Sequence, residues 1–316
     1  MNSPRSATRA AKTAEKGCEL PLVSVIVVNW NGAGDTIELV ESLLEQTYAH
    51  ISVVVVDNAS TSNDVDTLRA RFGSRIRMVT LDRNLGCGGG YNAGAVAALE
   101  ETRTEYLLTM NNDMTADRDL VSELVAVAES DARPGVVGAK IYYSDYEGRH
   151  DVLWSAGGVF HPWGWRIHSR RGAGTIDEGQ FEDVEAVDWV SGAAMLLRPE
   201  VFEAAGPFNP RHILGYEDME LCRKASAAGY GILFAPRARS WHKVGVSAVK
   251  AHISYTNPAA YYWFIRTCFP PHVYAWQLCL FPFLLAKWAV LYLAKSRDPR
   301  ALQSFARQIG LLFARR

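Results

Sequence analysis

The sequence predicts an α/β domain with a mostly parallel central sheet, and three of its features support this fold class. Short β-branched runs alternate with helical patterns through residues 22–110. Most of the apolar runs end in a cluster of Asn, Asp or Gly. The 316 residues are 48% apolar, which is enough to bury one large core. Strands that alternate with helices form parallel sheets whose two faces are both covered.

Four strands are expected in the amino-terminal part of the chain, each a run of mostly apolar residues. They span residues 23–28, 51–56, 76–81 and 106–110. Helices are expected between them, at residues 36–44, 65–72 and 92–101. A glycine-rich stretch, residues 86–90, is assigned to the turn that leads into the last of these helices.

Composition limits the partners and the compartment. The formal net charge is −1, so the chain carries no basic footprint for nucleic acid. Its five cysteines include no C-x-x-C pair, which favours a reducing, cytoplasmic compartment. Residues 1–20 contain Arg5, Arg9, Lys12 and Lys16 but no apolar stretch, so we expect a disordered basic tail rather than a secretory signal.

The carboxyl-terminal region, residues 251–316, is expected to be helical and to associate with a membrane. Residues 273–294 are long enough to cross a bilayer and are apolar except for Gln277 and Lys287. A single crossing would export the basic end of the chain, against the positive-inside tendency. We therefore expect a pair of in-plane or re-entrant helices, broken at Pro282, on the cytoplasmic face of the plasma membrane. Residues 302–313 form an amphipathic pattern that suits either lipid or a homodimer interface.

Acidic side chains occur at two positions where elements end or begin. Asp113 follows the strand 106–110, and Glu217 and Asp218 open a helical stretch. The simplest explanation of the second pair is an ordinary first helical turn, where acids complement the helix dipole. Because Asp113 lies where an open parallel sheet binds ligands, a second interpretation places all three acids in one crevice.

Asp57, at the end of the second strand, has two interpretations that the residues leave open. It caps a turn with Asn58 and Ser60, or it accepts the N3–H of a uracil or thymine ring. The glycines also have a competing interpretation, because Gly88-x-Gly90-x-x-Ala93 fits a dinucleotide fingerprint with an acid about 20 residues further on. That pattern would make the protein an NAD-dependent oxidoreductase, but it follows the third strand rather than the first.

Five motifs in this order resemble the family 2 inverting glycosyltransferases. They cover residues 22–246 and comprise residues 23–32, Val55-Val56-Asp57-Asn58-Ala59-Ser60, Asn84-Leu85-Gly86 to Asn92, Asn111-Asn112-Asp113, and Gly215-Tyr216-Glu217-Asp218. Residues 189–198, followed by Gly206-Pro207-Phe208, are similar to the rhamnosyltransferase branch of that family.

The resemblance implies a GT-A fold over residues 21–250 and assigns roles to its motif residues. Asp218 would be the catalytic base and Glu217 would contact a hydroxyl, although the two roles are exchangeable. Asp113, Asn111 and His242 would hold Mg²⁺ or Mn²⁺. His242 has an equally simple explanation as an imidazole hydrogen-bonded to backbone. The residues assigned to the nucleotide-sugar are Asn29, Asn31, Asp57, Asn84, Gly86, Asn92, Asn112 and Gly192.

Asn111 departs from the family pattern, in which two acids flank the metal motif. An amide oxygen still binds a cation, but the site loses one negative charge, so a lower divalent affinity is expected.

The function implied by the resemblance is metal-dependent, inverting transfer of a sugar to a glycan or lipid-linked acceptor in cell-surface polysaccharide biosynthesis. The expected donor is a dTDP-sugar carrying rhamnose. The alternatives are a UDP-hexose or UDP-galactofuranose donor, an NAD-dependent oxidoreductase, and a nucleotide-sugar-binding module without turnover.

Overall fold

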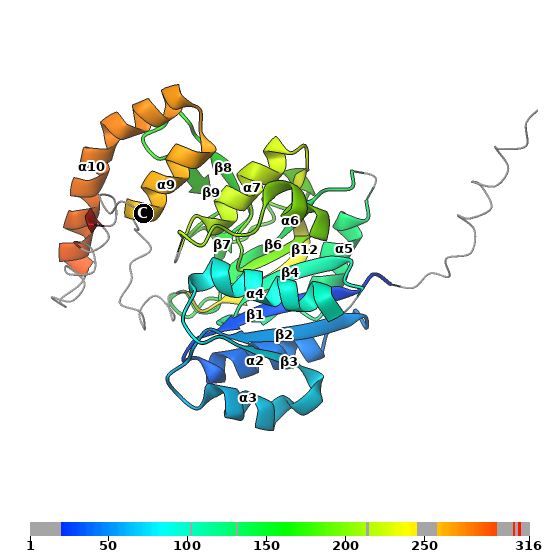
Figure 1. Cartoon of the computed structure of the whole chain (residues 1–316). Helices are drawn as coiled ribbons and strands as arrows, with labels where there is room; N and C mark the ends of the chain where they lie inside the picture. The colour runs from blue at the N-terminus through cyan, green and yellow to red at the C-terminus, as the bar shows by residue number, and fades with distance from the viewer. Residues whose placement is uncertain are drawn as a thin grey trace, which may run out of the picture.

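The computed structural model describes residues 20–101, 103–130, 132–212, 215–244 and 258–295, together with residues 306, 309 and 310. Within these ranges, ten strands form one sheet (Figure 1), in which eight strands follow the order β10-β12-β6-β11-β4-β1-β2-β3. The predicted basic tail lies outside the described residues, as does most of the predicted amphipathic segment 302–313.

The amino-terminal half of the sheet is parallel, as predicted. Its strands are β1 (Val23–Asn29), β2 (Ile51–Asp57), β3 (Arg77–Thr80) and β4 (Tyr106–Asn111). Strand β1 pairs in parallel with both β2 and β4. The carboxyl ends of these strands therefore lie at one edge of the sheet, where the polar residues of the predicted motifs follow them.

The carboxyl-terminal half of the sheet is mixed. Its strands are β5 (Met114–Ala116), β6 (Val136–Tyr143), β7 (Leu153–Ser155), β10 (Glu185–Ala186), β11 (Ala194–Leu197) and β12 (Ile232–His242). Strand β11 runs antiparallel to β4, and β12 runs parallel to β6. The start of β11 therefore lies beside the end of β4, which brings the two halves of the chain together at the same edge.

Helices cover both faces of the sheet and divide the core in two. Helices α2 (Ala33–Leu44), α3 (Asp64–Phe72) and α5 (Leu120–Ala128) pack on one face. Helices α4 (Gly86–Glu101), α6 (Pro199–Ala205) and α7 (Glu217–Ala227) pack on the other. In Figure 1, α2 and α3 lie below the strands and α7 lies above them. A short 3-10 helix, η2 (Gly73–Arg75), follows α3.

The predicted turn at residues 86–90 was wrong, because α4 already begins at Gly86. The glycines of this segment serve close packing rather than a turn. A Cβ atom at Gly90 would lie 2.7 Å from Val28 Cγ1, and one at Gly94 would lie 2.3 Å from Ile26 Cγ2. Residues four apart share one face of a helix, so this glycine face allows α4 to lie directly on β1.

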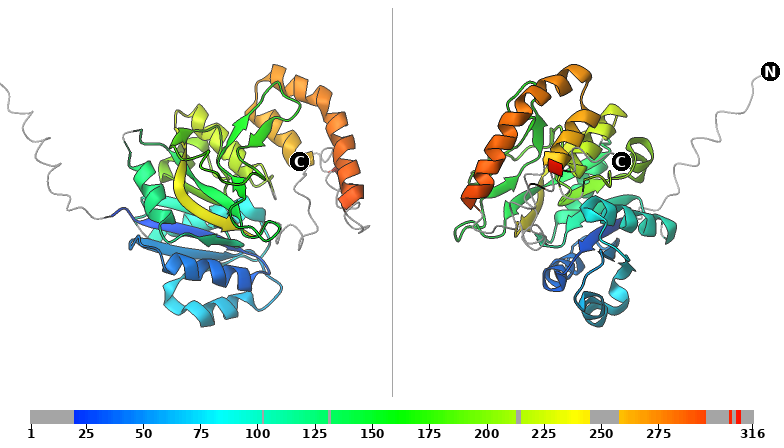
Figure 2. Two further views of the ribbon diagram at one scale, coloured as in Figure 1. Left: turned by 180° about the vertical axis from the view of Figure 1, so that it is seen from behind. Right: turned by 60° about the vertical axis from the view of Figure 1, so that its left-hand side comes forward.

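The carboxyl-terminal helices α9 (Pro258–Cys268) and α10 (Pro271–Lys295) pack against a hairpin of β8 (Gly158–Phe160) and β9 (His168–Arg170) (Figure 2). Gln277 of α10 is fully buried, and its Nε2 donates to the carbonyls of Pro162 (2.9 Å) and Gly164 (3.1 Å). Helix α9 shares the core of α7, so packing continues past residue 250.

The predicted break at Pro282 was wrong, because α10 continues through it. A proline removes one backbone hydrogen bond of the helix, and the remaining bonds and the packing of Phe281 and Leu284 maintain the helix.

The glycine face of α4 yields a stability prediction. Gly94→Ala should lower the free energy of unfolding by about 1–3 kcal/mol, because the added methyl group overpacks the contact with Ile26. Gly34→Ala in α2 is the matched control, since a Cβ there meets nothing within 4 Å. It should be neutral or stabilising by up to about 1 kcal/mol. Denaturant titration measures both, and equal effects at the two positions would contradict the packing argument.

Candidate active site

The candidate site lies at the edge where β1, β2 and β4 end. Asn29 ends β1, Asp57 ends β2 and Asn111 ends β4. The parallel register places Asn29 opposite Asp57 and Val28 opposite Asn111. The side chains that sequence analysis selected from separate motifs therefore meet at one edge.

Asp57 takes part in a buried polar network. Its Oδ1 accepts hydrogen bonds from Asn29 Nδ2 (2.9 Å) and Ser60 Oγ (2.6 Å), and its Oδ2 accepts one from the Ser60 amide (3.0 Å). The turn-capping interpretation of Asp57 is therefore confirmed. Its recognition of a pyrimidine stays a prediction, and Asp57 is only 3% exposed.

Asn29 is fully buried, and protein groups satisfy its amide. Nδ2 also donates to Asp64 Oδ2 (2.9 Å), and Oδ1 accepts from Thr36 Oγ1 (2.7 Å). Asp64, which sequence analysis did not select, accepts in addition from the Gly32 amide (2.8 Å). Burial opposes ionisation of Asp64, but hydrogen bonds from Ser62, Asn29 and the backbone hold its pKa below the ordinary value. Asn29 and Asp64 thus fix the loops around Asp57.

A second asparagine network shapes the loop before α4. Asn58 Nδ2 donates to Asn84 Oδ1 (3.1 Å) and to the Gly86 carbonyl (3.0 Å), while its Oδ1 accepts from the Leu85 amide (2.8 Å). Asn31 Oδ1 accepts from the Thr61 amide (2.8 Å). These contacts order the loops that follow β1, β2 and β3.

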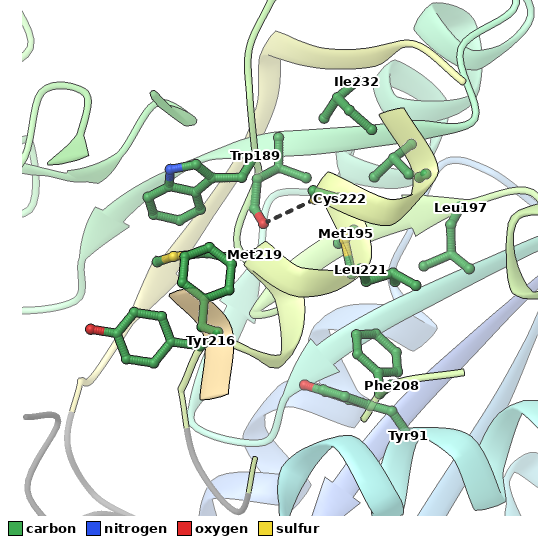
Figure 3. Close-up of a cluster of buried hydrophobic side chains, with 14 of the residues drawn as sticks. Tyr91, Trp189, Met195, Leu197, Phe208, Tyr216, Met219, Leu221, Cys222 and Ile232 are labelled. Carbon is green, nitrogen blue, oxygen red and sulfur yellow. Dashed lines mark hydrogen bonds between the residues drawn. The ribbon is translucent and has the colours of Figure 1, made fainter. Parts of the chain in front are cut away.

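Two further residues assigned to the nucleotide-sugar, Asn92 and Asn112, also hydrogen-bond to other parts of the protein. Asn92 donates to the Phe208 carbonyl (2.8 Å) and accepts from its amide (2.9 Å), which ties α4 to the segment before α7. Asn112 is 5% exposed and donates to Thr36 Oγ1 (3.1 Å). Figure 3 shows Tyr91 of α4 beside Phe208, at the base of this packing.

The three residues assigned to the metal lie together. His242 Nε2 is 3.0 Å from Asp113 Oδ1 and 3.5 Å from Asn111 Nδ2. Asp113 is 4% exposed and His242 is 3% exposed. Burial opposes ionisation of Asp113, but the hydrogen bond and charge of His242 keep its pKa below the ordinary value. Among the described residues, no group of three or more His, Cys, Asp or Glu side chains is arranged to hold a metal ion, so a third protein ligand beside Asp113 and His242 would have to come from another residue type.

Glu217 and Asp218 begin α7 after Tyr216, whose backbone is left-handed (φ 73°). Such a backbone is rare for a non-glycine residue and aims the first turn of the helix at the sheet edge. Asp218 Oδ2 accepts from the Gly192 amide (2.9 Å). A Cβ atom at Gly192 would lie 3.3 Å from Asp218 Cβ, so a residue without a side chain suits this approach.

The two acids differ in their hydrogen bonds. Burial, together with the charge of Asp218, raises the pKa of Glu217 to about 8, and its Oε2 has no hydrogen-bond partner. Burial also raises the pKa of Asp218, but amide groups of Gly192 and Met219 oppose that shift. Of two adjacent buried acids, the one with better hydrogen bonds loses its proton first. Asp218 therefore loses its proton before Glu217 as the pH rises.

A continuous set of contacts joins the metal residues to Asp218. From Asp113 it passes through His242 to Asn111, whose amide lies 2.8 Å from the Tyr91 hydroxyl. The same hydroxyl is 3.2 Å from the Gly192 carbonyl, and the Gly192 amide binds Asp218. No role for Tyr91 was predicted from the sequence, because its contacts with Asn111 and Gly192 depend on the pairing of β4 with β11.

A separate cavity of about 720 Å³ is lined by Thr115, Ser144, Gly148, Arg149, His150, Asp151 and Trp241. Trp241 and His242 are consecutive in β12, and consecutive side chains of a strand point to opposite faces. This cavity therefore lies across β12 from the acids and is not part of the candidate site.

Comparison with known proteins identifies similar sequences. Residues 24–202 match the family model described as Glycosyl transferase family 2. The uncharacterized protein y4gI of Sinorhizobium fredii is 32% identical over 239 residues, which cover 72% of this chain and 25% of the relative. The O-antigen biosynthesis protein RfbC of Myxococcus xanthus is 31% identical over 258 residues, covering 79% of this chain and 19% of the relative. The chain thus spans a quarter or less of these two relatives.

A relative of similar length is the N-acetylglucosaminyl-diphospho-decaprenol L-rhamnosyltransferase of Mycobacterium tuberculosis. It is 24% identical over 266 residues, which cover 76% of this chain and 80% of the relative.

Similar solved structures include the mannosyltransferase PcManGT of Pyrobaculum calidifontis in complex with GDP-Man and Mn²⁺. It has a TM-score of 0.55 and 19% identity, and the match covers 98% of this chain and 87% of that one. S. aureus TarS 1-349 in complex with UDP-GlcNAc has a TM-score of 0.53 and 16% identity, covering 78% and 64%. At these identities the likeness concerns the fold, and it confirms the predicted GT-A fold.

The two glutamates of α7 should respond to pH in opposite ways. The pKa of Glu217 is raised from 4.5 to about 8, so its ionisation removes stability as the pH rises through that window. Glu217→Gln should therefore gain about 1 kcal/mol or more over wild type between pH 5 and pH 9. The pKa of Glu220 is lowered from 4.5 to about 2, because bonds from His212 and Lys224 outweigh burial. Its contribution is present above pH 4.5 and is lost below it.

Glu220→Gln is accordingly the matched control, and it should destabilise the protein at pH 7 by about 1–3 kcal/mol. Melting curves of both variants and wild type across the pH range test this pair. The burial argument fails if Glu217→Gln gives no growing advantage at high pH.

Proposed function

We propose that this chain, which belongs to glycosyl transferase family 2, is an inverting glycosyltransferase that moves a sugar from a nucleoside-diphosphate donor to a hydroxyl of a glycan or lipid-linked acceptor. The observation that supports the proposal is the continuous set of contacts from Asp113 to Asp218, since these are the residues proposed as cation ligand and base. Family membership replaces the dinucleotide interpretation of Gly88 and Gly90, of which Gly88 packs against Phe208 and Gly90 packs against Val28 of β1.

The donor proposed here is a dTDP-sugar carrying rhamnose, used in cell-surface polysaccharide biosynthesis. The rhamnosyltransferase named among the relatives supports the sugar, and the O-antigen biosynthesis protein supports the process. Asp57 is the group proposed to accept the N3–H that uracil and thymine share. A UDP-hexose or UDP-galactofuranose donor is the alternative, since the same contact would bind either pyrimidine.

The divalent ion would be held by Asp113, His242 and the amide oxygen of Asn111. Oxygen and imidazole donors of this kind suit Mg²⁺ and Mn²⁺. The buried Nδ1 of His242 has no partner, and Nε2 is the ring nitrogen that faces Asp113. A bound ion would offset, as a Lewis acid, the charge that develops on the departing diphosphate.

The acceptor hydroxyl would lose its proton to Asp218. General-base catalysis of this kind contributes about 10²- to 10⁴-fold in rate. Glu217, which is protonated at neutral pH because its pKa is about 8, is left to donate a hydrogen bond to a sugar oxygen. Inversion follows if the base and the leaving group lie on opposite sides of the sugar.

Monotopic attachment to the cytoplasmic face of the plasma membrane is part of the proposal. Residues Pro271–Val290 are the one described segment that is long and apolar enough to cross a bilayer, and 22% of that window is buried. The polar contacts of Gln277 dock α10 on the β8–β9 hairpin, which favours a helix in the membrane plane. Aromatic side chains of the hairpin and of α10 are exposed beside each other, namely Trp163, Trp165, Trp276 and Phe283. Such residues anchor proteins at lipid interfaces.

Asp218→Asn should abolish sugar transfer but leave binding of the nucleoside diphosphate unchanged, because the amide keeps the shape and loses the basicity. The assay is release of nucleoside diphosphate from a panel of dTDP-, UDP- and GDP-sugars with an acceptor, with and without Mn²⁺. Asp113→Ala is the companion variant, and it should weaken donor binding only when the metal is present. Turnover by Asp218→Asn at the wild-type rate would rule out its role as base, and NAD binding without any donor hydrolysis would overturn the proposed function.

Phe283→Glu should remove the protein from anionic liposomes in a flotation assay, because a charge in the centre of the exposed apolar face opposes burial in lipid. Leu99→Glu is the matched control on α4, at a residue that is also exposed, and it should float like wild type. Equal flotation of both variants would contradict attachment through α10.

A further inference from the structure

Tyr91 is buried at the middle of the site, with 1% of its surface exposed. Two oxygen atoms of the structure lie close to its hydroxyl. Asn111 Oδ1 is 2.8 Å away and the Gly192 carbonyl oxygen is 3.2 Å away. The Cys87 thiol also hydrogen-bonds to this hydroxyl. A tyrosine has one proton to donate and two lone pairs to accept with, so it cannot donate to both oxygens at once.

The Gly192 carbonyl is fixed by the backbone, whereas the Asn111 amide has two orientations of the same shape. Which end carries the oxygen follows from the surrounding hydrogen bonds. If Asn111 turns its Nδ2 toward Tyr91, the amide donates to the hydroxyl and the hydroxyl donates to Gly192. The proton of the Tyr91 hydroxyl and one of its lone pairs then each have a partner.

The other end of the Asn111 amide faces His242. The hydrogen-bond partners there also determine which amide atom must face them. His242 Nε2 lies 3.0 Å from Asp113 Oδ1, which is an acceptor. Nε2 therefore either carries a proton or binds a cation that it shares with Asp113. In both cases its neighbour 3.5 Å away on Asn111 must be an oxygen, because an N–H group would face another N–H or a positive ion.

We propose that Tyr91 is a positioning residue that holds the Asn111 carbonyl oxygen toward Asp113 and His242, so that an asparagine serves as cation ligand. The inference rests on the proposed function, since it requires a divalent cation at these residues. It explains how the site tolerates an amide. A carboxylate presents an oxygen at both ends and needs no orientation, whereas an amide binds a cation through one end alone.

The test is a double-mutant cycle read by Mn²⁺ binding rather than by turnover. Electron paramagnetic resonance measures free Mn²⁺ during titration of the full chain in the presence of dTDP. Tyr91→Phe keeps the ring that packs on Phe208 (Figure 3) and removes only the hydroxyl. It should weaken Mn²⁺ binding about threefold to tenfold, the effect of losing one orienting hydrogen bond.

In the Asn111→Asp background the same Tyr91→Phe substitution should change Mn²⁺ binding by less than about twofold, because a carboxylate does not need the hydroxyl. Tyr48→Phe is the control for loss of a buried tyrosine hydroxyl, since Tyr48 donates to the Pro21 carbonyl outside the site. It should leave Mn²⁺ binding unchanged.

Two outcomes would overturn the inference and are distinguishable. If wild type binds Mn²⁺ and Tyr91→Phe weakens that binding equally in the wild-type chain and in the Asn111→Asp variant, Tyr91 does not act through the amide and only this inference falls. If wild type binds no Mn²⁺ with dTDP, the proposed metal site is wrong and the inference is wrong with it.

Discussion

The arrangement of the site depends on the antiparallel pairing of β4 with β11. This pairing sets Ala194 opposite Met110 and lets the Asn111 backbone amide donate to the Ala193 carbonyl (3.1 Å). The end of β4, where Asn111 lies, is thereby held beside Gly192, whose amide binds Asp218. Tyr91 then connects the two strands, with its hydroxyl between Asn111 and the Gly192 carbonyl. Backbone pairing therefore sets the spacing between Asn111 and Asp218.

The acids of this site differ in protonation because their buried surroundings differ. Asp113 is stabilised as an anion by the imidazole of His242, whereas Glu217 has no cationic partner among the described residues and holds its proton. Burial raises the pKa of Asp218, but hydrogen bonds from backbone amides oppose part of that shift. One edge of the sheet thus holds an ionised carboxylate, Asp113, and an acid that keeps its proton, Glu217, at the same pH.

Local patterns predicted the amino-terminal half of the fold well, because β-branched runs and polar strand ends are properties of short segments. Asp57 and Asp113 were selected for that reason, since the carboxyl ends of parallel strands meet at one edge. The start of α4 was misplaced because glycines favour turns in isolation, while here Gly90 and Gly94 pack on β1. Tyr91 was missed because its contacts come from long-range pairing, which a single sequence does not reveal.

The proposed mechanism requires one divalent ion, held by Asp113 and His242, in the same site as Asp218. The most direct measurement is a crystal structure of the chain grown with Mn²⁺ and dTDP, with anomalous scattering used to locate the metal. We expect a single strong manganese peak bonded to Asp113, His242 and the diphosphate, with Asp218 on the opposite side of the sugar position. A peak in the cavity beside Trp241, or a diphosphate bound away from Asp113, would contradict it.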